Sequence, residues 1–227
     1  MRGILVKRGF VGSAVVAGAL ALGASGASAF VVDFENESPL TPDPTNVGTS
    51  YINGGITFTS TEDMQLVGTG NPTSGFVPGD NPVPAGAFDD VFLTGDFNND
   101  TDMSLSFAKE LRSISFDIAD IDGGNDSQLG ESNEEQFTFD FLLGGSSVGS
   151  QVVTSNDVAG DAIVTNITYS GAFDSVNITG VTPGGTRNIG WGIDNISATP
   201  VPLPAGMVLM VSAFGGLGAL RLRRRKG

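Results

Sequence analysis

The sequence contains no cysteine and no histidine, and each absence excludes a class of site. Without cysteine the chain can form no disulfide, no thiolate zinc site and no cysteine nucleophile. Without histidine it lacks the commonest general base and cannot form a Ser-His-Asp triad. One tryptophan and two tyrosines also leave few rings that could stack on a sugar.

Basic residues are scarce and unevenly placed. The chain has 227 residues, with 11 Lys and Arg against 25 Asp and Glu, and a formal net charge of −14. All 25 acidic residues but only Lys109, Arg112 and Arg187 lie between residues 30 and 200, so this central part carries a charge of −22. Such a chain is a poor partner for nucleic acid, whose phosphates are bound through Lys and Arg. We therefore expect an acidic domain between two basic, apolar ends.

The N-terminal residues 1–29 have the three parts of a secretory signal peptide. An uncharged, apolar run, Phe10–Ala24, follows a basic start. The basic residues are Arg2, Lys7 and Arg8. Small residues, Ala27 and Ala29, occupy the −3 and −1 positions of a cleavage site before Phe30. We predict that signal peptidase cleaves there; the alternative, an uncleaved anchor, is disfavoured because Gly- and Ala-rich runs of this length insert weakly.

The C-terminal part predicts a single transmembrane helix. The run Ala205–Leu220 carries no charge over 16 residues. As a helix it would span roughly 24 Å, slightly less than a hydrocarbon core of about 30 Å, and snorkelling arginines would cover the deficit. A basic tail follows, made of Arg221, Arg223, Arg224, Arg225 and Lys226. By the positive-inside rule this tail stays in the cytoplasm, and the acidic domain lies outside.

Directly before this helix stands the motif Val201, Pro202, Leu203, Pro204 and Ala205. Its two prolines fix an extended backbone, a shape that a processing enzyme can grip. Motif, apolar helix and Arg-rich end together resemble the VPLPA-CTERM variant of the PEP-CTERM sorting signal. The resemblance covers the last 27 residues. It implies that an exosortase, a membrane-embedded cysteine protease of the transpeptidase type, removes the tail and passes the protein from the inner membrane to the cell surface. It also implies a bacterium that makes extracellular polysaccharide.

The central part alternates apolar and polar residues with period two, which is typical of antiparallel strands with one buried face. We predict an all-β, antiparallel, jelly-roll-like β-sandwich over residues 30–199, between the signal peptide (1–29) and the sorting region (200–227). The clearest runs are Met103–Phe107, Ile114–Ile118, Phe137–Phe141, Val176–Ile178 and Ile189–Ile193. Weaker candidates are Val31–Phe34, Ile56–Ser60, Val91–Thr94, Gln151–Thr154 and Ile163–Thr168. Ser38–Gly48 and Gly68–Gly86 are predicted loops, and Ala198–Pro204 a linker.

Acidic clusters suggest three places for a hard cation such as Ca²⁺, which prefers six to eight oxygen ligands. The first is Asp96, Asn98, Asp100 and Asp102, with oxygen side chains on every second residue. It is not an EF-hand, because Thr101 replaces the turn glycine and Phe107 stands at the bidentate glutamate position. The second contains Asp120 and Asp122 beside two glycines. Solvated acidic turns are the alternative for both.

The third place pairs the two ends of the domain through Asp33, Glu35 and Asp194. Asp33 and Glu35 are predicted in the first strand and Asp194 in the last. The Asp-Phe-Glu opening and the Gly-Ile-Asp-Asn-Ile closing resemble calcium-stabilised β-sandwich modules of the carbohydrate-binding type. That resemblance implies that first and last strands run together and share a structural ion. The alternative is that these residues are polar positions on edge strands.

The sequence favours an exported, non-catalytic surface or extracellular-matrix protein with a structural or adhesive role linked to exopolysaccharide. The alternative is a carbohydrate-binding module, and a secreted hydrolase is third. For sugar stacking only Trp191, Tyr51 and Tyr169 are available, and Trp191 falls on the apolar face of its strand, which predicts a core position. Acidic side chains such as Asp89, Asp90 and Asp194 could still accept hydrogen bonds from sugar hydroxyls. Glutamates for a glycosidase, Glu131, Glu134 and Glu135, lie in a stretch that is typical of a solvated turn.

Overall fold

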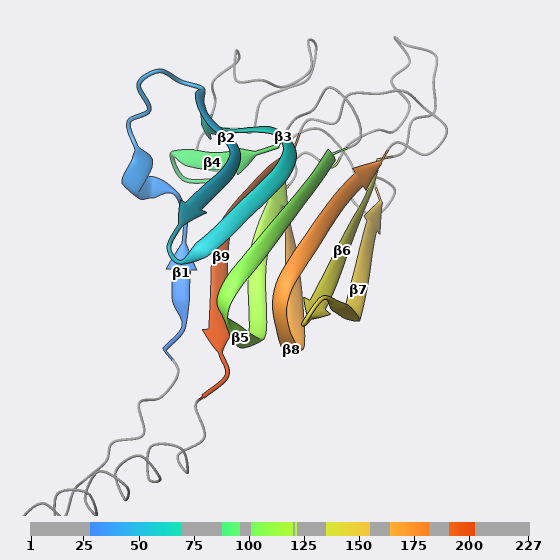
Figure 1. Ribbon diagram of the computed structural model, residues 1–227. Coiled ribbons are helices and arrows are strands. Elements are labelled where there is room, and N and C mark those ends of the chain that lie inside the picture. Colours follow the sequence, from blue (N-terminus) through green and yellow to red (C-terminus); the bar gives the residue numbers. More distant parts are fainter. Residues whose placement is uncertain are drawn as a thin grey trace, which may run out of the picture. The chain divides into compact units, whose positions relative to one another are not determined.

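The computed structural model describes residues 28–69, 88–95, 101–119, 121, 135–154, 164–181 and 191–202. In these residues the chain forms nine strands and one short 3₁₀ helix, so the all-β prediction is confirmed (Figure 1). The elements are β1 (Phe30–Val32), η1 (Glu35–Glu37), β2 (Thr45–Asn53), β3 (Ile56–Gly68), β4 (Val91–Thr94), β5 (Thr101–Ala119), β6 (Gln136–Leu143), β7 (Ser146–Thr154), β8 (Val164–Val181) and β9 (Gly192–Pro200).

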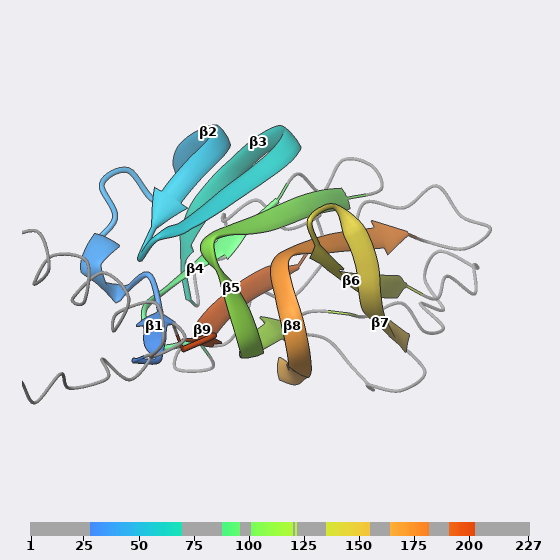
Figure 2. The same ribbon diagram turned by 60° about the horizontal axis from the view of Figure 1, so that its bottom comes forward.

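The strands form two layers, which are connected by the long strands β5 and β8 and by β3, whose last residues pair with β4 of the second layer. In the first layer the order is β2-β3-β5-β8-β6-β7; in the second, β9 lies between β5 on one side and β1 and β4 on the other. β5 pairs with β8 in both layers, and its register shifts between Ser106 and Ser113. Figure 2 shows both strands curving from one layer to the other. Strands that bend in this way make the corners of a sandwich and keep the two layers in register.

Two of the hairpins are closed by glycine pairs. Gly54 and Gly55 connect β2 to β3, and Gly144 and Gly145 connect β6 to β7, all four with φ between 56° and 84°. Positive φ at both central residues defines the type I′ turn, whose twist matches the twist of paired strands. Glycine adopts this conformation without the steric penalty of a Cβ atom.

The two turns differ in their surroundings. The same Gly→Ala substitution is therefore expected to lower the free energy of unfolding by different amounts. A Cβ on Gly54 would overlap the side chain of Val32 in β1, whereas one on Gly144 would meet nothing within 4 Å, although their φ angles are 56° and 57°. Gly144→Ala is therefore expected to cost about 1–2 kcal/mol through left-handed strain alone. Gly54→Ala is expected to cost about 1–3 kcal/mol more, because it also overpacks the contact with β1. Chemical denaturation of the two variants, and of Gly54→Ala combined with Val32→Ala, checks this; equal losses for the two single variants would contradict it.

Phenylalanine dominates the core between the layers. The inward positions predicted from the alternation are buried in β6 (Phe137, Phe139 and Phe141) and in β5 (Ile114, Phe116 and Ile118), among others. Trp191 is fully buried and its ring centroid lies 5.6 Å from that of Phe137, so its predicted core position is confirmed.

Five predictions of element boundaries were wrong, one of them being that Ile163–Thr168 and Val176–Ile178 are separate strands, since both belong to β8. Residues 45–48 of the predicted loop belong to β2, and residues 198–200 of the predicted linker belong to β9. Asp33 and Glu35 do not lie on the first strand, because β1 ends at Val32 and Glu35 opens η1. The runs around Leu105 and Phe116, predicted as two strands, are one continuous strand, since the chain bends without leaving extended geometry.

The first and last strands are neighbours. β1 pairs antiparallel with β9, with Phe30 opposite Ala198 and Val32 opposite Ile196. β1 therefore begins and β9 ends at the same end of the sandwich, as Figure 1 shows. Among the described residues no helix has the length and hydropathy needed to cross a membrane. The predicted signal peptide up to Ala27 and the predicted helix Ala205–Leu220 lie outside those residues.

Candidate functional site

Three acidic residues from distant parts of the chain lie near enough to Asp194 for their charges to act on it; we call Asp33, Glu35, Asp89 and Asp194 the acidic cluster. Asp33 follows β1, Glu35 opens η1, Asp89 lies two residues before β4, and Asp194 lies in β9. Pairing of β1 and β4 with β9 brings these segments together. The sequence predicted three of the four members.

A glycine and an aromatic pair set the approach of Asp89 to β9. A Cβ on Gly192, the first residue of β9, would lie 2.5 Å from the ring of Phe92 and 3.1 Å from that of Phe88. The two rings are themselves 5.5 Å apart and fully or almost fully buried. Because Gly192 has no side chain, these rings pack directly on β9, and Asp89, which follows Phe88, is held near Asp194.

Asp194 is the most unusual residue of the cluster. It is 0% exposed, and neither of its carboxylate oxygens makes a hydrogen bond of good geometry; among the described residues, the only polar group that favours its charged form is the backbone N–H of Asn195. Burial raises the pKa of Asp194 from 3.8 to about 8; the backbone N–H of Asn195 opposes this rise, and the charges of Glu35, Asp33 and Asp89 add to it. A buried carboxylate without a partner is strongly destabilising unless it is neutralised by a proton or by a cation. A proton or a cation that neutralises Asp194 would therefore stabilise the folded state.

The backbone around the cluster is strained. In the described residues, positive φ outside glycine occurs at Phe34 (55°), Asp89 (38°) and Asn195 (53°), and each of these residues belongs to the cluster or adjoins a member. Asn195 also forms a β-bulge, because Ser115 and Asp117 of β5 pair with Ser197 and Asp194, which leaves one extra residue on β9. Each such residue costs about 1–3 kcal/mol, and strain of this kind concentrates at functional sites.

Glu35 connects the cluster to β4. One oxygen of its carboxylate, Oε1, accepts hydrogen bonds from the backbone N–H groups of Asp90 (2.9 Å) and Val91 (3.0 Å). The Glu35 N–H in turn donates to Asp33 Oδ1 at 3.4 Å. These contacts fix η1 against the start of β4 and hold the side chains of Glu35 and Asp33 by hydrogen bonds to backbone N–H groups.

The cluster suits a hard divalent cation in chemistry. Its donors are all carboxylate oxygens, which Ca²⁺ prefers, and a chain without cysteine or histidine offers none of the sulfur or nitrogen donors typical of zinc. The orphaned oxygens of Asp194 are the observation that fits an ion here. Among the residues that the structure describes, no group of three or more acidic side chains is placed so that it could hold a metal ion. Binding would therefore require the side chains of the half-buried Asp33 and Glu35 and the exposed Asp89 to turn toward Asp194.

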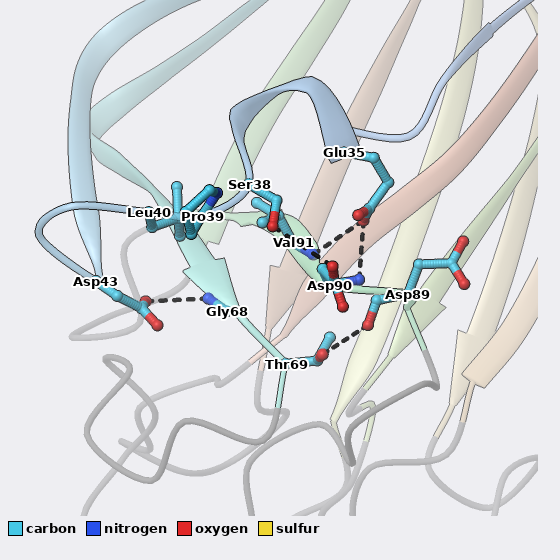
Figure 3. A pocket seen from close by; sticks show the side chains of 10 residues that line it. All are labelled: Glu35, Ser38, Pro39, Leu40, Asp43, Gly68, Thr69, Asp89, Asp90 and Val91. Atoms are coloured by element: carbon cyan, nitrogen blue, oxygen red, sulfur yellow. Dashed lines mark hydrogen bonds between the residues drawn. The ribbon is translucent and has the colours of Figure 1, made fainter.

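A cavity of about 680 Å³ adjoins the cluster (Figure 3). It lies between the loop after η1 and the facing ends of β3 and β4. The described residues that line it are Glu35, Ser38, Pro39, Leu40, Asp43, Gly68, Thr69, Asp89, Asp90 and Val91. Glu35 and Asp89 belong both to this lining and to the acidic cluster. Four of the lining residues are acidic and none is basic.

Of the other predicted cation ligands, only Asp102 lies in the described residues. It belongs to the first cluster, and its Oδ1 accepts hydrogen bonds from the Thr61 N–H (3.1 Å), the Thr61 hydroxyl (2.8 Å) and the Ser60 hydroxyl (3.3 Å). Asp102 thus ties β5 to the middle of β3. The remaining members, Asp96, Asn98, Asp100, Asp120 and Asp122, lie outside the described residues.

The predicted sorting residues are described only in part. Val201 and Pro202 are exposed directly after β9, and the Val201 N–H donates to the Glu110 carbonyl at 2.9 Å. The rest of the motif (203–205) and the basic tail (221–226) lie outside the described residues, as does Ala27, while Ala29 is exposed. These predictions stay predictions.

The residues available for stacking on sugars are mostly engaged. Trp191 lies in the core. Tyr51 is half-buried and donates to Glu37 Oε1 at 3.1 Å; burial raises its pKa to about 12. Tyr169 is half-buried, lies parallel to the Phe141 ring at a centroid distance of 4.0 Å, and donates to the Val148 carbonyl. A sugar site in this domain would therefore depend on hydrogen bonds more than on exposed rings.

Sequence reasoning missed Asp89 as a member of the acidic cluster. From the sequence, Asp89 is expected only as an acceptor for sugar hydroxyls. A signal was present, since Phe88-Asp89-Asp90 directly precedes the predicted strand Val91–Thr94, and a strand entry can bring polar residues to the edge of a sheet. Without the pairing of β4 with β9, that signal does not identify Asp194 as the neighbour.

No protein-family model matches the sequence, and no curated protein matches it either. Solved structures of low similarity include the module TmCBM61 in complex with β-1,4-galactotriose, with 13% identity, coverage of 64% of this chain and 88% of the other, and a TM-score of 0.37. The K1 cleaved adhesin domain of Lys-gingipain from Porphyromonas gingivalis W83 has 8% identity, coverage of 77% and 99%, and a TM-score of 0.39. The mannan-recognising carbohydrate-binding module TmCBM27 has 12% identity, coverage of 78% and 97%, and a TM-score of 0.32. Similarity at this level does not determine function, which must be inferred from the chain's own residues.

Proposed function

We propose that the chain is an exported, non-catalytic surface protein whose β-sandwich is stabilised by a divalent cation and contacts extracellular polysaccharide. The observation that carries this proposal is the buried carboxylate of Asp194, which makes no hydrogen bond of good geometry and lies near enough to Asp33, Glu35 and Asp89 for their charges to act on it. Such a site is useful outside the cell, where a domain with a charge of −22 and no disulfide needs another source of stability. Asp33, Glu35, Asp89 and Asp194 would hold the ion, and the ion would supply the positive charge that the cluster lacks.

The position of the cluster supports a role as a clamp. Asp33 and Glu35 follow the first strand, and Asp194 lies in the last strand, so an ion shared among them would tie together the two ends of the domain. These are also the ends that continue into the export signal and the sorting region. We propose a jelly-roll-like sandwich on the same ground, namely the pairing of terminal strands and the two strands that run through both layers.

Calcium titration of the full chain tests the proposed function. Isothermal titration calorimetry is expected to detect one site with a dissociation constant of about 10⁻⁵–10⁻³ M, a range typical of sensor and extracellular calcium sites. Asp194→Asn is expected to abolish it, and Asp140→Asn, which changes a carboxylate on β6 that accepts from the Ser147 hydroxyl, is expected to leave it unchanged. Absence of any heat with the unmodified chain would refute the proposal.

We further propose that the C-terminal region is a VPLPA-type sorting signal that an exosortase processes. The support is the motif itself and its place directly after β9, where Val201 and Pro202 are exposed. Before processing, the helix Ala205–Leu220 would hold the chain in the inner membrane with its basic tail in the cytoplasm.

Replacing Pro202 and Pro204 by alanine is expected to block processing, because these two prolines fix the extended backbone that the exosortase would recognise. In the native host the altered protein is expected to accumulate in the membrane fraction at its unprocessed mass, with at least a tenfold loss of the cell-surface form. Leu220→Ala, within the apolar run but away from the motif, serves as the control. Unchanged surface delivery of the proline variant, measured by cell fractionation and mass spectrometry, would rule out recognition of this motif.

A further inference from the structure

Charge is unevenly distributed between the two ends of the sandwich. β3 spans it from end to end: its first residue, Ile56, pairs at the bend of β5, whereas its last, Gly68, lines the acidic cavity of Figure 3. Four acidic residues and no basic residue belong to the described lining of that cavity. The bend of β5 carries Lys109 and Arg112, both exposed and the only basic residues that the structure describes. Two positive charges and one negative charge give residues 107–113 a net charge of +1, so the domain is polarised along β3.

The end of β9 is fixed to this bend of β5. Pro200 pairs with Leu111, and the Val201 N–H donates to the Glu110 carbonyl at 2.9 Å. Figure 1 shows the start of β1 at the same end of the sandwich. Ala205, where the predicted membrane helix begins, follows Val201 by four residues, which span at most about 14 Å. A helix inserted in a membrane would therefore bring the bend of β5 close to the lipid surface.

Exposed apolar side chains gather beside the two basic residues. Of the five large hydrophobic residues that are exposed in the described part of the chain, three lie here: Val31 in β1, Ile52 just before the β2–β3 turn, and Val201. A cavity of about 240 Å³ separates that turn and β1 from the bend of β5 and the end of β9, and Lys109 lines it. The other lining residues are mostly apolar and include Phe30, Phe107, Leu111 and Pro200. Apolar and basic side chains side by side favour the boundary between lipid headgroups and acyl chains.

We propose that this end of the sandwich, which we call the basic end, docks on anionic lipid while the chain is anchored in the membrane. The basic end comprises the start of β1, the β2–β3 turn, the bend of β5 and the end of β9. The inference rests on the proposed sorting signal and goes beyond it, because it gives the anchored domain an orientation.

Two electrostatic effects turn the domain in the same direction. Lys109 and Arg112 attract lipid phosphates, and each basic residue near such a surface favours the docked state about fivefold. The acidic cavity at the other end of β3 is repelled by the same lipid. The docked domain therefore holds the residues after β9 at the membrane surface, where a membrane-embedded protease can reach them, and turns its acidic cavity away from the membrane.

Fluorescence quenching by a labelled lipid tests the orientation. The chain has no cysteine, so an introduced thiol carries a single fluorophore. Ala108→Cys places it on the exposed bend of β5, and Thr179→Cys places it on an exposed position of β8. Thr179 lies six residues beyond Phe173, the partner of Leu111 at the bend, which is roughly 20 Å along the strand. The full chain is made by cell-free synthesis into nanodiscs of phosphatidylcholine, with or without about 30% phosphatidylglycerol, that contain a lipid with a spin-labelled headgroup.

In the anionic nanodiscs, quenching at position 108 is expected to be at least about threefold stronger than at position 179. About 0.5 M NaCl, or neutral nanodiscs, should lower the quenching at position 108 at least about twofold, because salt screens the attraction. Lys109→Gln combined with Arg112→Gln should lower it equally. Lys109→Arg combined with Arg112→Lys keeps both charges and serves as the control, with unchanged quenching.

The outcomes separate this inference from the proposed sorting signal. Equal quenching at the two positions, or quenching at position 108 that neither salt nor the double glutamine variant lowers, would overturn docking through the basic end and leave the membrane anchor standing. A chain that does not insert into the nanodiscs at all would overturn both. If the double glutamine variant slows processing in the native host while position 108 shows no dependence on anionic lipid, the basic end binds a protein partner and the assignment to lipid is wrong.

Discussion

Replacing Asp194 by asparagine is expected to stabilise the calcium-free protein and to abolish its stabilisation by calcium. In the calcium-free state at neutral pH, the buried carboxylate must take up a proton or remain charged without a partner. Raising a pKa from 3.8 to about 8 corresponds to several kcal/mol at pH 7, at about 1.36 kcal/mol for each pH unit. The asparagine side chain carries no charge, so this penalty is removed. Its buried amide lacks hydrogen-bond partners, however, and this costs about 1–3 kcal/mol of the gain. The expected net gain is about 2 kcal/mol, or about 4–8 °C in melting temperature.

Calcium is expected to stabilise the unmodified chain but not the Asp194→Asn variant. At a concentration 100 times its dissociation constant, an ion that binds only the folded state adds about 2.7 kcal/mol. Over the expected range of dissociation constants, the unmodified chain should gain about 0.4–2.7 kcal/mol between EDTA and 1 mM calcium, and Asp194→Asn should gain none. The control variant Asp140→Asn removes one negative charge from β6 instead. Its stabilisation by calcium should equal that of the unmodified chain. A calcium-dependent melt that is identical in the unmodified chain and in Asp194→Asn would show that the ion lies elsewhere.

The second large effect is a dependence of stability on pH that calcium removes. The folded-state pKa of Asp194, about 8, lies above its unfolded value of 3.8, so between these values the folded protein binds more protons than the unfolded one. Stability in EDTA should therefore be highest near pH 4–5, fall by up to about 1.4 kcal/mol for each pH unit, and level off above about pH 8. Bound calcium requires the ionised carboxylate, so in calcium the fall should disappear or reverse.

Chemical denaturation at pH 5, 6, 7 and 8, with and without calcium, measures this pH dependence. Asp194→Asn supplies the reference, since it should show a nearly flat profile between pH 5 and 8 in both solutions. If the calcium-free protein instead gains stability between pH 5 and 8, the buried carboxylate already has a positive partner and the clamp is unnecessary.

The strands that the sequence revealed most clearly are those with one buried and one wet face. Phe137, Phe139 and Phe141 alternate with polar residues, and all three are buried. β2 escaped prediction because Gly48 interrupts its alternation and its register with β3 shifts on both sides of that glycine. The continuity of β5 escaped because the bend between Ser106 and Ser113 breaks the period of two without ending the strand.

The part of the acidic cluster that depends on the pairing of the first and last strands could be predicted from the sequence. Asp33, Glu35 and Asp194 were expected to meet through the first and last strands, and β1 and β9 do pair. Two features depended on three-dimensional detail. Asp89 joins the cluster through the pairing of β4 with β9, and Asp194 is buried in a strand whose bulge at Asn195 no pattern of hydropathy encodes.

The position of a bound ion is the most direct test of this account. Crystals of the protein grown with calcium, or with terbium as a stronger anomalous scatterer, should give an anomalous peak about 2.3–2.6 Å from an oxygen of Asp194. The side chains of Asp33, Glu35 and Asp89 should be turned toward the same peak. A fully occupied peak found only elsewhere in the chain, with Asp194 still unpartnered, would contradict the central claim.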